Sequence, residues 1–155
     1  MKNLNKTITL CIFAAIFSVS ASANEFKKQI EARQAYMTIL SYNMGTLGAM
    51  AGNKMPYDAE LASTAAQNLA LAAGMNNGTM WPQGSDLDSH GDTRAKAVLW
   101  QNFPDVVQYL NNLKDSADLL ANTAGNGLTA LQKNIGPVGK TCKGCHDDFR
   151  KKKSQ

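Results

Sequence analysis

Residues 128–149 read LTALQKNIGPVGKTCKGCHDDF and predict one amphipathic helix. The apolar and cysteine positions advance in alternating steps of three and four: Leu128, Leu131, Ile135, Val138, Cys142, Cys145 and Phe149. This spacing places all of these side chains on one face of an α-helix. Both cysteines of the segment are therefore expected to face the core.

The same rhythm recurs in earlier parts of the chain. It predicts three more helices, each with a core stripe. In the first expected helix the stripe is Phe26, Ile30, Arg33, Met37, Leu40, Met44, Leu47 and Ala51. In the second it is Leu61, Ala65, Leu69 and Ala72, and in the third it is Phe103, Val106, Leu110, Leu113, Ala117 and Leu120. The second helix should begin near Met55–Asp58, because proline and aspartate are both favourable in a first turn. The third should begin between Ala95 and Pro104.

One long connection separates the second and third expected helices. Glycine, proline and asparagine interrupt any regular pattern between Gly74 and Thr93, and Trp81 is expected to pack inward from this segment. His90, in the same segment, is expected to be solvated. Four amphipathic helices with these connections predict an all-α fold, an antiparallel four-helix bundle formed by residues 24–155 as one domain.

Residues 1–23 have the features of a cleaved secretory signal. They begin with Lys2 and Lys6, continue through an apolar run from Ile8 to Val19, and end in Ala-Ser-Ala. The run is too short to span a membrane, so no stable membrane insertion is expected. Export predicts a periplasmic location, and it leaves two cysteines in the mature chain because Cys11 lies within the signal.

The charge balance excludes one class of partner. The formal net charge is +4, and two of the basic residues belong to the signal. A mature chain that is so mildly basic argues against binding to nucleic acid. Outside the cysteine motif there are no paired carboxylates, nucleophile with a base, or phosphate loop on a common element, so an enzyme is not expected.

The pentapeptide Cys142-Lys143-Gly144-Cys145-His146 matches the CxxCH signal for attachment of a c-type haem. The two thiols add covalently to the haem vinyl groups, and the adjacent imidazole binds the iron. On a helix the second cysteine and the histidine lie three and four residues from Cys142, so all three project from one face. The motif predicts one covalently attached haem c, with His146 as a metal ligand.

Two other interpretations of the cysteine pair fit less well. A thioredoxin-like redox pair is disfavoured because no strand precedes the motif. A structural zinc site needs about four ligands, and the only other mature histidine is His90.

With these motifs the chain resembles the class II cytochromes c, the cytochrome c' group of helical-bundle haem proteins. The resemblance covers residues 25–153 and rests on the CxxCH motif near the C-terminus, continued by Asp147-Asp148-Phe149-Arg150. Weaker supporting pieces are Arg33-Gln34-Ala35-Tyr36-Met37, Pro56-Tyr57-Asp58, and Ala95-Lys96 upstream of Trp100. It implies the four-helix bundle and relatives that often dimerise, so a homodimer is an open expectation.

The resemblance places Met37 above the iron, and this residue separates two functions. If the Met37 sulfur binds iron, the centre has His/Met ligation, and the protein is a periplasmic electron-transfer protein acting with redox partner proteins. If Met37 only packs above the iron, the centre is five-coordinate and binds nitric oxide or carbon monoxide. The sequence favours the electron carrier, because Leu47-Gly48-Ala49-Met50 resembles the Met-ligated branch, whereas Arg33-Gln34 favours the gas-binding alternative.

Cofactor-binding roles are also expected for Arg33 and Gln34. Arg33 precedes Met37 by one turn on the same stripe, and an arginine fork can bind a haem propionate through two hydrogen bonds. Gln34 is expected to add a weaker polar contact. Arg150, four residues after His146, is expected either at the proximal face or as a solvated cation. The lysines around this end of the chain form either a docking patch for acidic partners or a solvated helix terminus.

Overall fold

The computed structural model describes residues 25–153 and is helical, as expected. The signal segment predicted for residues 1–23 lies outside the described residues. The long helices are α1 (Lys27–Ala51), α2 (Ala59–Ala73), α4 (Phe103–Thr123) and α5 (Leu128–Phe149), and the short ones are η2 (Gly78–Met80) and α3 (Val98–Gln101). Within residues 25–153, no helix is long and apolar enough to cross a membrane.

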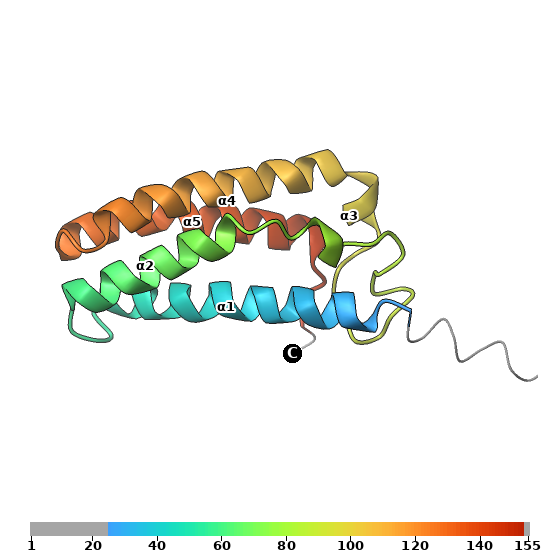
Figure 1. The fold of residues 1–155 in the computed structure, drawn as a ribbon, viewed down its shortest axis with the longest axis horizontal. Helices are drawn as coiled ribbons and strands as arrows, with labels where there is room; N and C mark the ends of the chain where they lie inside the picture. Colours follow the sequence, from blue (N-terminus) through green and yellow to red (C-terminus); the bar gives the residue numbers. More distant parts are fainter. Residues whose placement is uncertain (1–24, 154–155) are drawn as a thin grey trace, which may run out of the picture.

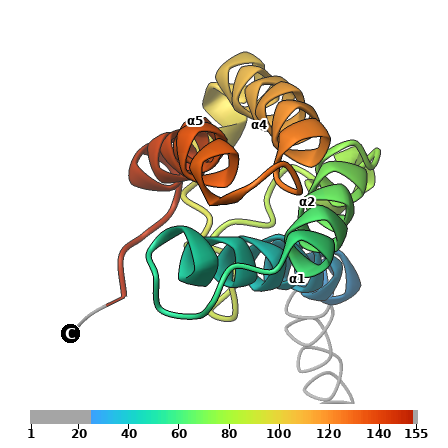
Figure 2. The same ribbon diagram turned by 90° about the vertical axis from the view of Figure 1, so that its left-hand side faces the viewer.

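The long helices form the expected antiparallel bundle. α1 packs against α2 and α5, and α4 packs against the same two helices, so the four surround one core (Figure 2). Successive long helices run in opposite directions along the bundle (Figure 1). The bundle has a closed end, formed by the connections 52–58 and 124–127, and a loop end, formed by residues 74–97, α3 and the C-terminal turns of α5.

The helix starts follow from local chemistry. Asp58 caps α2, because its Oδ1 accepts a hydrogen bond from the Leu61 amide at 2.8 Å. The third predicted helix is divided into α3 and α4, and the break is at Asn102, whose φ and ψ are −122° and 39°. Pro104 has no N–H to donate to the Trp100 carbonyl four residues earlier, and its ring would clash with that carbonyl in a continuous helix, which explains the break.

Most of the predicted core positions are buried, with one correction in α2. Ile30, Leu40 and Leu47 of α1 are buried, as expected. Leu61 of α2 is 40% exposed, so its predicted core position is wrong. The buried positions on α2 are Ala62, Ala65, Ala66, Leu69 and Ala73. These are mainly alanines, and small contact residues let a helix approach its neighbours closely.

The loop end contains a second correction. His90 is only 8% exposed, so the prediction that it is solvated is wrong. Its backbone amide donates to the Asp86 carbonyl, and its ring lies edge-on to Phe26 with ring centroids 5.7 Å apart. The turn at Asp86 therefore directs the imidazole inward. Trp81 packs inward as expected, and its Nε1 donates to Asn77 Oδ1.

Candidate haem site

The CxxCH motif lies in the last two turns of α5, at the loop end. Cys142, Cys145 and His146 are all half-buried, and no disulfide joins the two cysteines. Cys142 packs against the large core cluster of the bundle, whereas Cys145 packs against a smaller cluster around Leu99, Val106 and Phe149. The motif thus lies where the two clusters meet.

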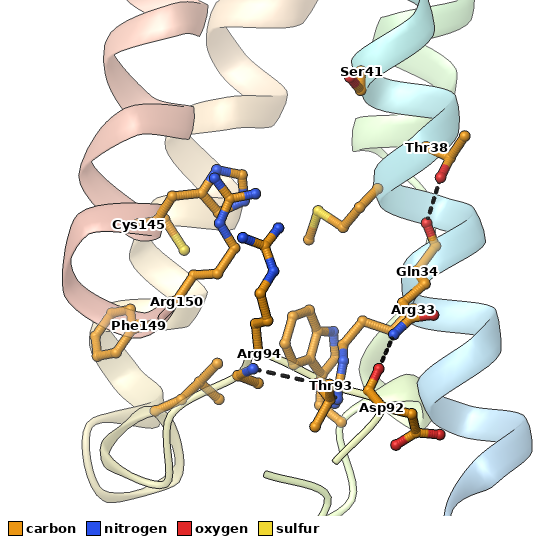
Figure 3. Close-up of a pocket in the computed structure, with 15 residues that line it drawn as sticks. Arg33, Gln34, Thr38, Ser41, Asp92, Thr93, Arg94, Cys145, Phe149 and Arg150 are labelled. Carbon is orange, nitrogen blue, oxygen red and sulfur yellow. Dashed lines mark hydrogen bonds between the residues drawn. The ribbon is translucent and has the colours of Figure 1, made fainter. Parts of the chain in front are cut away.

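Two cavities adjoin the motif, with volumes of about 400 Å³ and 210 Å³. Both are lined by Met37, Ser41, Cys145 and His146. The larger one opens between α1, α5 and the long connection, as Figure 3 shows. The smaller one extends between α1, α4 and α5, with Leu40, Met44, Leu110 and Leu113 in its wall. Each of the predicted site residues lines at least one cavity.

Met37 and His146 belong to different helices, yet both line the two cavities. Met37 is half-buried on α1 and packs against the large cluster. The sequence prediction that its side chain faces the core side of the bundle is therefore confirmed. Whether its sulfur binds iron stays a prediction.

Arg33 makes contacts that the sequence did not predict. The side chain is 4% exposed, and both terminal nitrogens donate to the long connection. Nη1 donates to Met80 O and Ser85 Oγ, and Nη2 donates to Ser85 O at 2.9 Å and to Thr93 Oγ1 at 2.9 Å. The guanidinium also lies over the Trp81 ring, 4.8 Å from its centroid. Arg33 thus ties α1 to the connection, and its pairing with a propionate stays a prediction.

Gln34 is the exposed neighbour of this arginine. Its side-chain amide donates to the Asp92 carbonyl, so it too contacts the long connection. It also lines the larger cavity. Its contact with a haem carboxylate stays a prediction.

Burial shifts the titration of the motif. It raises the pKa of Cys145 to about 11, with a smaller effect from Cys142, and it raises the pKa of Cys142 as well. Burial lowers the pKa of His146, and the positive charges of Arg150 and Arg94 lower it further. The thiols are therefore protonated at neutral pH, unlike those of a thioredoxin-like pair. A neutral imidazole is the form that binds iron.

Tyr109 of α4 covers the middle of the motif and was missed by sequence reasoning. Its hydroxyl donates to Asp148 Oδ2 at 2.9 Å, and its ring packs edge-on to Phe149. A Cβ atom at Gly144 would lie 2.9 Å from Tyr109 Cε1. Glycine at position 144 therefore permits the close packing of α4 on the haem motif.

Arg94 was also missed, and together with Arg150 it lines the larger cavity. It lies in the irregular connection, where no periodicity indicates which side chains point inward. The only sequence signal was its position just before Ala95-Lys96 in the segment that resembles the class II cytochromes.

The residues present fit a covalent haem better than a zinc ion. Two thiols and an imidazole share one face of α5, a pair of cavities adjoins them, and arginines suited to carboxylates line the larger cavity. Among residues 25–153, no group of three or more His, Cys, Asp or Glu side chains is placed to hold a metal ion. A zinc site therefore has no ligand set in the described part of the chain.

Comparisons with known proteins agree with this chemistry. The family model described as "Cytochrome C'" matches residues 28–150. A cytochrome c' from Halomonas halodenitrificans is 38% identical over 129 residues, which cover 78% of this chain and 94% of the relative. A cytochrome c-554 from Cereibacter sphaeroides is 33% identical over 130 residues, which cover 84% and 98%.

Solved structures show the same similarity. The structure of cytochrome c' from Shewanella frigidimarina is 33% identical and superposes with a TM-score of 0.74, covering 83% of this chain and 98% of that one. A cytochrome c' from a Rhodobacter species gives a TM-score of 0.80 at 34% identity, with 83% and 98% covered. The similarity extends over nearly the whole length of these relatives.

Proposed function

Because the chain belongs to the cytochrome c' family, we propose that it is a periplasmic protein in which a haem iron, held by His146, binds a small uncharged diatomic molecule. Nitric oxide and carbon monoxide are the ligands of this kind that we would test. A bound haem would supply a redox-active iron that can bind a small molecule. The other parts of the proposal concern what the chain's own residues do.

Three residues of α5 hold the haem in this proposal. Cys142 and Cys145 carry the thioether bonds, and His146 provides the axial nitrogen. Their spacing on one helix face and their shared cavities support these roles. Burial lowers the pKa of His146, which favours the neutral imidazole that binds iron.

The observation that carries the gas-binding function is the character of the smaller cavity. Beyond the attachment motif, its wall consists mostly of Met37, Leu40, Met44, Leu110 and Leu113. Apart from His146, no ionisable nitrogen or carboxylate of the described residues lines it. Transfer of a charged or strongly polar molecule into such a wall without partners is costly. A neutral diatomic molecule enters without that cost.

The electron carrier favoured by the sequence remains the second candidate. Membership of the cytochrome c' family supports the gas-binding alternative better, since such proteins are typically five-coordinate. One observation favours the carrier: Met37 lines both cavities beside His146. A thioether ligand at this place would favour ferrous iron and raise the reduction potential.

The deciding experiment is the optical spectrum of the purified ferric and ferrous holoprotein, repeated with carbon monoxide. We expect high-spin bands and ready binding of carbon monoxide. Low-spin bands, a near-infrared sulfur-to-iron charge-transfer band and indifference to carbon monoxide would instead establish the carrier.

Two matched variants sharpen this test. Met37→Leu should leave the spin state unchanged if gas binding is right, whereas it should convert a His/Met centre to high spin and open it to carbon monoxide. Met50→Leu makes the same chemical change further along α1, at a residue that lines neither cavity. It should therefore be silent under both hypotheses.

The homodimer also belongs to the proposal. One solved relative, 29% identical to this chain, is a cytochrome c' with ligand-controlled dimer dissociation. In this chain Ile39 and Tyr42 of α1 are 51% and 73% exposed, and Leu71 of α2 is 75% exposed. Sedimentation velocity with and without carbon monoxide would test whether the protein is dimeric and whether the ligand separates the subunits.

A further inference from the structure

Arg94 and Arg150 point into the larger cavity from two segments that pair with each other. Arg94 belongs to the long connection, and Arg150 follows the last residue of α5. Figure 3 shows both guanidinium groups directed toward the space between α5 and α1. Residues 56 positions apart are thus brought to one wall of the cavity.

Backbone hydrogen bonds hold these two segments in place. Residues 94–96 and 149–151 form a clamp, in which the Lys96 amide donates to Phe149 O at 2.9 Å and the Lys151 amide donates to Arg94 O at 2.9 Å. Ala95 and Arg150 form the antiparallel bridge between them. The Lys96 ammonium adds bonds to the carbonyls of Asp147 and Asp148. The positions from which both arginines project are therefore fixed by the fold.

The charges of the two arginines are not balanced. The ion pairs among residues 25–153 involve lysines only, and neither Arg94 nor Arg150 takes part in one. Asp92 is the only carboxylate residue in the wall of the larger cavity, and in Figure 3 it points away from both guanidinium groups. Arg150 is an exposed residue, and Arg94 Nη1 makes one long hydrogen bond, to the Lys151 carbonyl at 3.4 Å. Partial desolvation, followed by the charge of Arg94, lowers the pKa of Arg150. Two cations thus face a shared space without an anion between them.

We propose that Arg94 and Arg150 form a carboxylate-binding site and that the carboxylate held there is a propionate of the haem. This inference rests on the haem binding in the proposed function. Arginine forks bind carboxylates through two parallel hydrogen bonds, and a carboxylate would balance the charge. Arg33 cannot take over this role without giving up its bonds to Ser85 and Thr93. Arg94 is accordingly a positioning residue for the haem.

The test compares Arg94→Gln with Lys151→Gln in the holoprotein. Both changes remove one positive charge from the clamp, but Lys151 does not line the cavity. The readout is the resonance Raman bending band of the haem carboxylates. We expect this band to shift in Arg94→Gln, to shift less in Arg94→Lys, and to stay unchanged in Lys151→Gln. Loss of a charge-assisted bond should also lower the melting temperature of Arg94→Gln by roughly 5 °C.

Two results would overturn the proposal. The first is an unchanged band in both Arg94→Gln and Arg150→Gln. The second combines two measurements: added acetate raises the melting temperature of the wild-type protein, and the haem carboxylate band stays unchanged in the arginine variants. Together they would mean that the site binds a free carboxylate and not a haem propionate. If Arg94→Gln does not fold, Arg94→Lys carries the test alone, and an unchanged band in it together with Arg150→Lys counts against the site. A purified wild-type protein without haem absorption would instead refute the proposed function.

Discussion

The closed end and the loop end of the bundle differ in how their interiors are packed. At the closed end, Ala62, Ala66, Leu120 and Leu131 are fully buried. At the loop end, the buried set includes polar side chains such as Arg33, Ser85 and Thr93. Arg33 and Thr93 line the larger cavity of about 400 Å³, and the smaller one of about 210 Å³ shares Met37 and the haem motif with it. Close-packed apolar contacts stabilise a protein without any ligand. A cavity forgoes such contacts, and under the proposed function the haem would fill this space.

The largest expected effect comes from removing the haem. Replacing Cys142 and Cys145 together with alanine eliminates covalent attachment, so the purified protein should lose its haem absorption. Amide exchange should then be at least about tenfold faster at Lys96 and Lys151, whose amides hold the clamp. Hydrogen-exchange mass spectrometry would measure this, with the closed-end turns of α5 as the internal reference. Equal acceleration at both ends would contradict the comparison.

The second effect should be confined to the closed end. Leu131→Ala removes a side chain with 0% exposure and should lower the free energy of unfolding by about 2–5 kcal/mol. The haem spectrum should not change, because Leu131 lines neither cavity. Denaturant unfolding and an optical spectrum of the same sample test both statements. A change in spin state would show that the two ends are coupled.

A smaller effect is expected where the loop end is held by polar contacts. Thr93→Val keeps the shape of the side chain but removes the oxygen that accepts from Arg33 Nη2 and from the Ala95 amide. A buried donor left without its acceptor costs about 1–3 kcal/mol. Chemical denaturation should detect the loss. Thr46→Val is the control and should be nearly neutral: its hydroxyl donates to the Tyr42 carbonyl one turn earlier in α1, and the residue lines neither cavity.

The smallest effect concerns the contact between α4 and the haem motif. Gly144→Ala would push the Tyr109 ring outward, since the new Cβ lies 3.1 Å from the hydroxyl oxygen. Gly139 lies on the same helix, and a Cβ atom there would have no neighbouring atom within 4 Å. Gly139→Ala should therefore raise the free energy of unfolding by up to about 1 kcal/mol through helix propensity. Gly144→Ala should fall short of that gain. Thermal unfolding of the pair measures the difference, and equal gains would mean that Tyr109 moves freely.

Tyrosine titration provides a second readout of the same variant. The hydrogen bond to Asp148 raises the pKa of Tyr109 above that of a free tyrosine. A folded-state pKa that is raised contributes stability below the unfolded pKa, and this contribution is lost as the pH rises through the folded value. Gly144→Ala should return the Tyr109 pKa toward its ordinary value. Ultraviolet absorption between pH 9 and about pH 12 would follow it, with Gly139→Ala unchanged.

The bundle could be predicted from the sequence because apolar residues recur every three or four positions along its helices. This period predicted a core stripe from Leu128 to Phe149, and the structure contains one helix, α5, over those residues. It predicted the core less well in α2, where alanines occupy most of the stripe and the exposed Leu61 looks like a core residue. In alanine-rich segments, hydrophobic size does not mark the buried face clearly.

The candidate site was predictable only where it lies on helices. The CxxCH motif and Met37 follow from spacing on α5 and α1, and both line the cavities. The burial of His90, the inward direction of Arg94 and the bonds of Arg33 all depend on the path of residues 74–97. That path is set by turns and long-range hydrogen bonds, which leave no periodic trace in the sequence.

The clamp between residues 94–96 and 149–151 also has a consequence for the order of folding. Its bonds join residues more than fifty positions apart. Closing a loop of that length costs chain entropy before any bond of the clamp forms, and such long-range contacts form more slowly than the turns of a helix. The long connection is therefore expected to become fixed only after α5 has packed on the bundle, which makes the wall of the larger cavity one of the last parts to form.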